Sequence, residues 1–367
     1  MTSRERFLTA LTGGTPDRVP LGDYLFSRNL LKRELNHVPQ LYEADVQVRL
    51  ATKLGLDCMW IPINGFCGIE EEVHAEGEHY QDEWGVTYIK NGWPIMAQID
   101  VPIKSRADWE CYTLPSADAP HRLNMLAAGT KANTGDIAII AGVVGPFTMM
   151  YWYLMDLETL SITLYDDPQL VHEMCAAFVN WALAVATRAV AQGGVDAFSI
   201  SDDWGSTRSL LMSPAHLREF FIPPFRKLVQ GLKSLGKPVI MHNDGQIWDV
   251  LDDLVDTGIS GFHPVERAAG MDLAKVKQRY AGRLCPIGNV DNKITMSTGT
   301  PAQIEAEVKE CLAIGKAGGG YILSTDHSIH DGMPCENVMA YLEAAKKHGV
   351  YPQSNRPTRI GVKAPAT

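Results

Sequence analysis

The chain has 367 residues, of which 46% are hydrophobic and 21% charged, a composition typical of globular proteins with a large core. Its formal net charge of −10 argues against non-specific binding to nucleic acid or anionic membranes, and no apolar run approaches the ~20 residues of a membrane-spanning helix. The seven cysteines are scattered and form no CxxC pair, so we expect reduced thiols in a cytoplasmic protein. Residues 1–10 are charged and amphipathic, unlike a signal peptide.

The first part of the chain predicts two helices that alternate with two strands. Apolar spacing and the Gly and Pro breaks predict a helix at 3–11, a strand at 19–24, a helix at 41–54 and a strand at 56–63.

Residues 64–135 interrupt this alternation. Between residues 70 and 104 polar and apolar residues alternate, and Asn91-Gly92 is a hairpin-type turn signal. Because a loop of this length is uncommon inside a compact domain, we interpret it as a small β insertion between the second and third strands of the core. Residues 105–133 are a polar connection with one or two helices.

From residue 136 onward strands and helices alternate regularly. The predicted strands are 136–144, 195–200, 238–241, 259–262, 284–287 and 321–323. The predicted helices are 146–161, 168–192, 213–235, 247–257, 272–280, 301–317 and 336–348. The tail, residues 351–367, contains proline and basic residues, and we expect it to be flexible.

This order predicts an α/β fold with a parallel sheet. Eight strands that alternate with helices fit a (β/α)8 TIM barrel, formed by residues 1–350 as a single domain with the insertion at about 64–135. A doubly wound open sheet is the alternative architecture.

Polar residues follow most of the predicted strands. They are Asp202, Asp203, His242, Asp244, His263, Glu266, Asn289, Asp291, Asp326 and His327. A barrel gathers such strand ends at one mouth, where the active sites of barrels lie. Imidazole and carboxylate groups suit Zn²⁺ or another divalent metal, with three protein ligands and an open position in a catalytic site. His242 and Asp244, two residues apart on extended backbone, point to the same side.

The alternative is that these residues cap helices and anchor loops, as Asp and Asn commonly do. We weigh it for Asp244 and Asp291, and more strongly for Asp202 and Asn289. His263 precedes a proline, and we interpret it as a core histidine. The chain has no glycine-rich phosphate loop after an early strand, no Gly-x-Ser-x-Gly elbow and no His-Glu-x-x-His helix.

Several short motifs occur in a specific order. They are R-E-R-F-L-T-A-L and P-D-R-V-P near the start, G-P-F-T at 145–148, I-G-N-V-D at 287–291 and S-T-D-H-S-I-H-D-G-M-P-C-E-N-V at 324–338. In the order and spacing of these motifs, the chain resembles the uroporphyrinogen decarboxylase superfamily over nearly its whole length. The resemblance implies a (β/α)8 barrel, in agreement with the strand count.

The resemblance favours one branch of that superfamily. The decarboxylases are cofactor-free and hold propionate groups with an R-Q-A-G-R-Y type motif, whereas residues 22–29 read G-D-Y-L-F-S-R-N, with the single Arg28. The cobalamin-dependent methyltransferases bind zinc, and those that act on thiols use His-x-Cys and a distant Cys. The matching positions are His242, Asp244 and His327, and Glu266 falls where that branch has an acidic residue near the metal.

The resemblance therefore implies zinc held by His242, Asp244, Glu266 and His327. Without thiolates the ion is harder and more Lewis-acidic, which suits an ether or phenolate oxygen. The implied function is that of an O-demethylase methyltransferase, which moves a methyl group from a methoxylated, aromatic substrate to a corrinoid protein or cobalamin. Asp203 or Glu266 would complete the metal shell or move a proton.

Aromatic residues near strand ends are candidates for the wall around a flat ring. They are Tyr24, Phe26, Phe66, Trp84, Phe147 and Trp204. The alternative functions are metal-free decarboxylation and a catalytically silent partner of a corrinoid protein. A homodimer is a candidate assembly.

Overall fold

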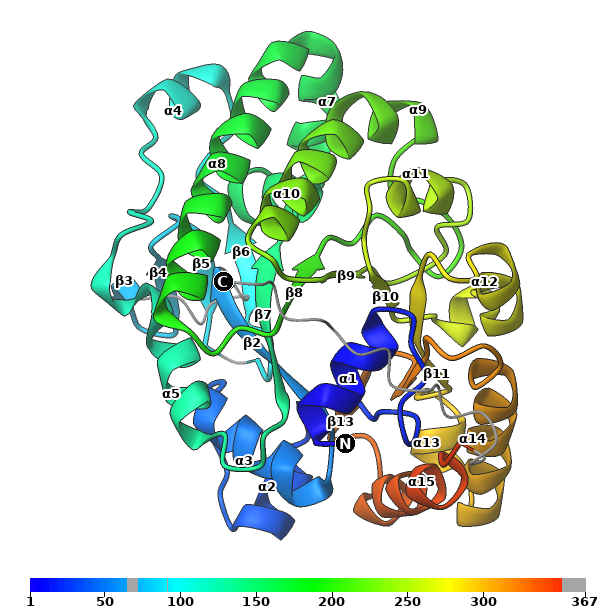
Figure 1. Ribbon diagram of the computed structural model, residues 1–367. Coiled ribbons are helices and arrows are strands. Elements are labelled where there is room, and N and C mark those ends of the chain that lie inside the picture. Colours follow the sequence, from blue (N-terminus) through cyan, green and yellow to red (C-terminus); the bar gives the residue numbers. More distant parts are fainter. Residues whose placement is uncertain (65–71, 91, 352–367) are drawn as a thin grey trace, which may run out of the picture.

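The structure, a computed structural model, describes residues 1–64, 72–90 and 92–351. Seven parallel strands form one curled sheet in the order β12-β11-β10-β9-β8-β7-β2 (Figure 1). They are β2 (Cys58–Asn64), β7 (Ala138–Val144), β8 (Ala197–Ser201), β9 (Val239–His242), β10 (Gly261–His263), β11 (Cys285–Val290) and β12 (Ile322–Thr325). The predicted α/β fold with a parallel sheet is confirmed, and the curled sheet is consistent with a TIM-barrel-like fold.

The segment before β1 (Tyr24–Phe26) bonds to strands at both edges of this sheet. Gly22 N donates to Leu323 O of β12 at 3.1 Å, and Asp57 N, just before β2, donates to Leu21 O at 2.8 Å. β1 itself pairs in parallel with β13 (Ser328–His330). The strand predicted at 19–24 therefore exists as a single bridge at Leu21 followed by β1, because its partner changes from β12 to β13.

Helices surround the sheet (Figure 1). Those outside the segment between β2 and β7 are α1 (Ser3–Leu11), α2 (Arg28–Leu35), α3 (Ala44–Leu54), α6 (Pro146–Thr148), α7 (Leu157–Asp166), α8 (Pro168–Gln192), α9 (Pro214–His216), α10 (Ile222–Ser234), α11 (Leu251–Val255), α12 (Leu273–Arg279), α13 (Thr295–Thr298), α14 (Pro301–Gly315) and α15 (Cys335–His348). Two π-helical segments, η2 (Met149–Leu154) and η3 (Leu217–Phe221), and the short 3-10 turn η4 (Arg267–Ala269) complete the set.

Three predicted helices differ from the observed ones. The helix predicted at 213–235 contains a π-helical segment, η3, between α9 and α10. The helix predicted at 146–161 is divided into α6, η2 and α7, because the chain is extended at Met155 and Asp156 and the Asp156 side chain caps α7 by accepting from Thr159 N at 2.6 Å. The helix predicted at 247–257 is reduced to α11. Sequence reasoning also missed α2, which Ser27 caps through Leu30 N.

Among the described helices, α8 alone is long and apolar enough to cross a membrane by length and composition. Half of its most apolar window is buried inside the protein, and α8 contacts α10 and β2. A core helix of a soluble protein passes the same test of length and composition, so the properties of α8 are only weak evidence for a membrane-spanning helix.

Between β2 and β7 the chain forms an antiparallel sheet of four strands in the order β3-β4-β5-β6. The elements here are β3 (Glu72–Glu76), β4 (His79–Asp82), β5 (Thr87–Ile89), β6 (Ala97–Asp100), α4 (Arg106–Cys111), η1 (Pro120–Leu123) and α5 (Asn124–Ala132). Trp84 is fully buried and packs edge-on against Trp181 of α8, with ring centroids 4.7 Å apart. Trp93 Nε1 donates to Phe26 O at 2.8 Å, which links the insertion to β1.

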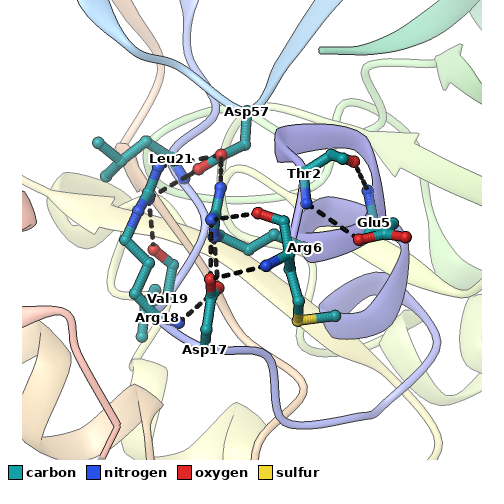
Figure 2. A network of polar contacts seen from close by, with 9 residues as sticks. Thr2, Glu5, Arg6, Asp17, Arg18, Val19, Leu21 and Asp57 are labelled. Atoms are coloured by element: carbon teal, nitrogen blue, oxygen red, sulfur yellow. Dashed lines mark hydrogen bonds and ion pairs between the residues drawn. The ribbon is translucent and has the colours of Figure 1, made fainter. Parts of the chain in front are cut away.

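A group of four buried or half-buried charges, here called the N-terminal ion cluster, joins the start of the chain to β2 (Figure 2). Its members are Arg6, Asp17, Arg18 and Asp57. Asp57 is fully buried; it accepts from Arg6 Nη1 at 2.7 Å, from both Arg18 Nη atoms at 2.8 and 3.0 Å, and from Leu21 N at 2.8 Å. Asp17 accepts from Arg6 Nε at 2.6 Å. Because α1 contacts β2, β7 and β12, this cluster holds α1 at the amino-terminal end of the strands.

Candidate metal centre

Three potential metal ligands meet at the carboxyl ends of β9 and β12. His242 ends β9, Asp244 lies two residues beyond it, and His327 lies two residues beyond β12. One ligand atom from each lies within 4.8 Å of the others. Asp244 Oδ2 is 3.0 Å from His327 Nε2, and Asp244 Oδ1 is 3.6 Å from His242 Nε2. His242, Asp244 and His327, called the metal-type group below, are three of the four predicted ligands.

The turn after β9 aims the Asp244 carboxylate. Gly245 has φ +88°, and a Cβ there would lie 2.5 Å from Ser206 O, so the close turn requires glycine. Asp244 N donates to Asp203 Oδ1 at 3.1 Å, which brings the predicted catalytic Asp203 beside the group. His327 is held from behind, because its Nδ1 lies 2.7 Å from Ser328 Oγ.

Glu266, predicted as a ligand and as a catalytic group, is buried and points its oxygens at other partners. Its Oε2 accepts from Gly245 N at 2.7 Å, and its Oε1 pairs with Lys293 Nζ at 3.1 Å. In this arrangement Glu266 supports the turn that carries Asp244. Its role as a ligand stays a prediction.

His263 was interpreted from the sequence as a core histidine, and the structure brings it against His242. The Nδ1 atoms of the two buried rings are 2.8 Å apart, and the ring planes are inclined by 24° with centroids 5.0 Å apart. The signal available in the sequence was that two neighbouring predicted strands each end in histidine.

Burial and charge set the protonation of the group. Burial lowers the pKa of His242 to about 4, an effect that Asp244 opposes and His327 reinforces. Burial favours the neutral acid at Asp244, but His242 and His327 outweigh it and hold the pKa of this carboxyl well below its usual range. At neutral pH His242 is therefore an uncharged imidazole and Asp244 a carboxylate, which are the forms that bind metal.

The pKa values of the two neighbouring groups, Asp203 and His327, are raised. Burial and the nearby Asp244 raise the pKa of Asp203 to about 8. Burial lowers the pKa of His327, but the hydrogen bond that His327 donates to Asp244 outweighs burial and the net shift is upward.

The donor set fits a divalent cation. Asp244 Oδ1 is buried and accepts no hydrogen bond from the described residues, and buried carboxylate oxygens are ordinarily satisfied by a donor or an ion. Two imidazole nitrogens and one carboxylate are the three-ligand set typical of catalytic zinc sites, which leave the fourth position open.

An aromatic pocket of about 180 Å³ opens onto the group. Its aromatic lining consists of Tyr24, Phe26, Trp60, Tyr151, Trp152 and Tyr153, and His242, Asp244, His327 and Asp203 form its polar part. Trp60 lies across β7 at Gly142, where a Cβ would come within 2.1 Å of the indole nitrogen. No Lys or Arg lines the pocket among the residues described.

Of the six aromatic residues predicted as pocket walls, Tyr24 and Phe26 line the pocket. Trp84, Phe147 and Trp204 are fully buried core residues, and Phe66 lies outside the described residues. Sequence reasoning missed Trp60 and the run Tyr151–Tyr153 in η2, although three consecutive aromatic residues after a strand were a visible signal.

The remaining strand-end residues serve the backbone, as the capping alternative predicts. Asp202 Oδ1 accepts from Thr148 N at 2.7 Å, and Asp291 Oδ1 accepts from Ile294 N at 2.5 Å. Asn289 Nδ2 donates to Val265 O at 2.6 Å, and Asp326 Oδ1 accepts from Asn292 N at 2.9 Å. None of the four belongs to the metal-type group.

Fold and site together define a TIM-barrel-like protein with a metal-type group at the carboxyl ends of its strands. The model of the uroporphyrinogen decarboxylase (URO-D) family matches residues 85–348, and the chain belongs to this family. The resemblance at superfamily level is therefore confirmed.

Named relatives agree with the family. A uroporphyrinogen decarboxylase from Anaeromyxobacter sp. (strain Fw109-5) is 25% identical over 359 residues, covering 92% of this chain and 97% of the relative. Another from Mannheimia succiniciproducens is 24% identical over 267 residues, covering 68% and 71%. The solved structure of a methyltransferase from Methanosarcina mazei matches with a TM-score of 0.72 and 21% identity over 95% of this chain and 99% of that chain, a likeness of fold.

Proposed function

We propose that the protein is a zinc-dependent methyltransferase that removes a methyl group from a methoxylated aromatic substrate and passes it to a corrinoid protein or cobalamin. The observation that carries the proposal is the His242, Asp244 and His327 group at the polar end of an aromatic pocket. A structural neighbour named as a methyltransferase supports the same direction.

The roles of the residues follow from their positions. His242 Nε2, His327 Nε2 and the Asp244 carboxylate would hold the ion, and Glu266 would stiffen the turn beneath Asp244 or enter the ligand set. A bound zinc ion supplies Lewis acidity toward the oxygen from which the methyl group departs. Asp203 lines the pocket beside Asp244, where a carboxyl group can hold or deliver a proton to that oxygen.

The aromatic walls orient the substrate ring and exclude water. Tyr24, Phe26 and Trp60 come from the first two strands, and Tyr151 to Tyr153 come from η2. The cavity is smaller than the roughly 300–1,000 Å³ of pockets for drug-sized ligands. It is therefore suited to one substituted ring.

The alternative, metal-free decarboxylation of a porphyrinogen, has support in the names of the relatives. A porphyrinogen with eight carboxylates needs cations around it, because buried unpaired carboxylates are costly. The nearest candidate in sequence, Arg28, pairs with Asp331 at 3.3 Å and lies over the Trp93 ring at 5.4 Å. The absence of cations from the described pocket lining therefore favours methyl transfer.

The proposal is tested with the purified protein and a reduced corrinoid protein. We expect about one zinc per chain and methylation of the corrinoid, seen in its absorbance, with 2-methoxyphenol as donor. Turnover with 4-hydroxy-3-methoxybenzoate should be slower, because its carboxylate finds no cation in the pocket. Well-folded protein without bound metal, or release of CO₂ from uroporphyrinogen, would overturn the proposal.

A catalytically silent partner of a corrinoid protein is the third candidate. His242→Ala separates it from an enzyme: loss of activity with corrinoid-protein binding intact excludes the silent role.

We also propose that residues 1–350 form one domain, interrupted at about 64–135, and that the protein acts in the cytoplasm, as a homodimer if it assembles. Size-exclusion chromatography with light scattering tests the assembly. The predicted flexible tail lies outside the described residues from 352 onward, and Tyr351, its first residue, is buried.

A further inference from the structure

We propose that His263 is a positioning residue that determines which ring nitrogen His242 offers to a metal ion. The inference rests on the proposed metal site and extends it to a residue that is not itself a ligand.

The two histidines are fixed against each other by the sheet. They occupy partner positions in the β9–β10 ladder, and His263 O accepts from Asn243 N at 2.8 Å. Tyr24 packs edge-on against both rings, with centroids 5.2 Å from His242 and 4.9 Å from His263. His263 therefore has little freedom to turn away from His242.

The contact between them is made by one specific atom of each ring. Nδ1 of His242 lies 2.8 Å from Nδ1 of His263, a hydrogen-bond distance between two buried side chains. Two nitrogens at this distance share a single hydrogen, because one must donate and the other accept. The pair therefore has two arrangements, which differ in the nitrogen that carries the hydrogen.

Only one arrangement is compatible with metal binding. His242 Nε2 is the nitrogen that faces Asp244, so it must keep its lone pair free for the ion. The hydrogen of His242 must then be on Nδ1 and be donated to His263 Nδ1. In the other arrangement His242 carries its hydrogen on Nε2 and directs it at Asp244.

His263 supplies the acceptor that the metal-ready arrangement requires. Without it, the buried Nδ1–H of His242 would lose its partner, and buried donors without partners are costly. Partners that orient a metal-binding histidine are typically worth about 10–100-fold in metal affinity. The other histidine of the group, His327, has Ser328 Oγ in the corresponding place.

The test compares two substitutions at His263 with a matched control. His263→Phe keeps a ring and removes the acceptor, and we expect about 10–100-fold weaker zinc binding in competition with a chromophoric chelator. His263→Asn keeps an acceptor near the Nδ1 position and should restore most of the affinity. His348→Phe changes a half-buried histidine that pairs with Glu305, and this variant should bind zinc like the parent. Thermal unfolding checks that each variant is folded.

A folded His263→Phe variant with parental zinc affinity overturns the inference. If that variant does not fold, the parent protein decides: ¹⁵N spectra of its histidines should show the zinc-bound His242 protonated at Nδ1 and ligated through Nε2. Ligation through Nδ1 would exclude the role of His263.

Failure of the proposed function is distinguishable from failure of this inference. A parent protein that binds no zinc overturns the metal site. Absence of a hydrogen bond between the two Nδ1 atoms in the metal-free spectra overturns the inference about His263.

Discussion

At the amino-terminal end of the strands, the N-terminal ion cluster gives Asp57 two guanidinium groups and a backbone donor, so each of its oxygens is satisfied. At the carboxyl end, Asp244 faces two imidazoles and keeps one buried oxygen without a hydrogen-bond donor among the described residues. Asp57 is fully buried, whereas Asp244 is half-buried and keeps bonding capacity facing a pocket. The difference teaches that a carboxylate whose hydrogen-bond donors are incomplete keeps the capacity to bind a cation, which is what the proposed metal site requires.

The largest loss of stability is expected from a substitution at Asp57. Asp57→Asn should reduce the free energy of unfolding by about 3–5 kcal/mol, because Arg6 and Arg18 would be left near the interior without their shared carboxylate. Urea denaturation measures the loss, and metal content should not change.

The control for this prediction is an exposed ion pair of the same type. Arg4 and Asp136 are 3.0 Å apart with side chains 39% and 50% exposed, so Asp136→Asn should cost at most about 1 kcal/mol. Equal losses of unfolding free energy from the two substitutions would mean that burial adds nothing to the stabilising effect of the N-terminal ion cluster.

Asp23 provides a third case, because its buried carboxylate has hydrogen-bond donors but no guanidinium partner among the described residues. It accepts from Ser324 Oγ, from Thr325 and from Tyr341 OH at 2.7–3.0 Å, and burial raises its pKa to about 6 in spite of these bonds. The folded protein therefore holds a proton on Asp23 that the unfolded chain gives up near pH 4.

The sign of the effect follows from this raised pKa. The contribution is fully present below about pH 4 and is lost as the pH rises through about 6, a change of about 3 kcal/mol. Asp23→Asn should remove this part of the pH dependence, which denaturation curves at several pH values between 4 and 7 would measure. Parallel curves for the parent and the variant would contradict the assignment.

The smallest effect on stability is expected at the carboxyl end. Asp244→Asn repeats the Asp57 substitution at the proposed metal site, where the side chain is 34% exposed and pairs with a 41% exposed His327. The free energy of unfolding of the metal-free protein should fall by at most about 1 kcal/mol, while zinc affinity falls by about 100-fold or more, beyond the loss from an orienting partner. A large loss of stability with intact zinc binding would mean that Asp244 stabilises the fold and is not a metal ligand.

The fold was predictable where periodicity is strong. The seven strands of the curled sheet and most of the long helices follow from apolar runs and their Gly and Pro breaks. The first strand was placed too early, because Leu21 pairs through single backbone contacts that leave no pattern in the sequence. The division of the helix around Met155 depends on backbone geometry that apolar spacing does not encode.

The candidate site was predictable to the level of strand ends. His242, Asp244 and His327 meet because parallel strands bring their carboxyl ends together. The position of Glu266, aimed at Gly245 N and Lys293, depends on side-chain packing that spacing does not reveal. The proline after His263 favours a core histidine in the sequence, although the contact of His263 with His242 depends only on strand register.

The hydrogen bonds that Asp23 accepts from Thr325 and Tyr341 span almost the whole polypeptide, because Asp23 and Tyr341 are 318 positions apart in the sequence. During synthesis at about 5–20 residues per second, Asp23 leaves the ribosome roughly 15–60 s before its partner is made. The first strand must therefore wait, unpaired, while the rest of the molecule is translated. Until β13 is made, β1 has no partner strand, and a chaperone that shields nascent chains would find its backbone unpaired.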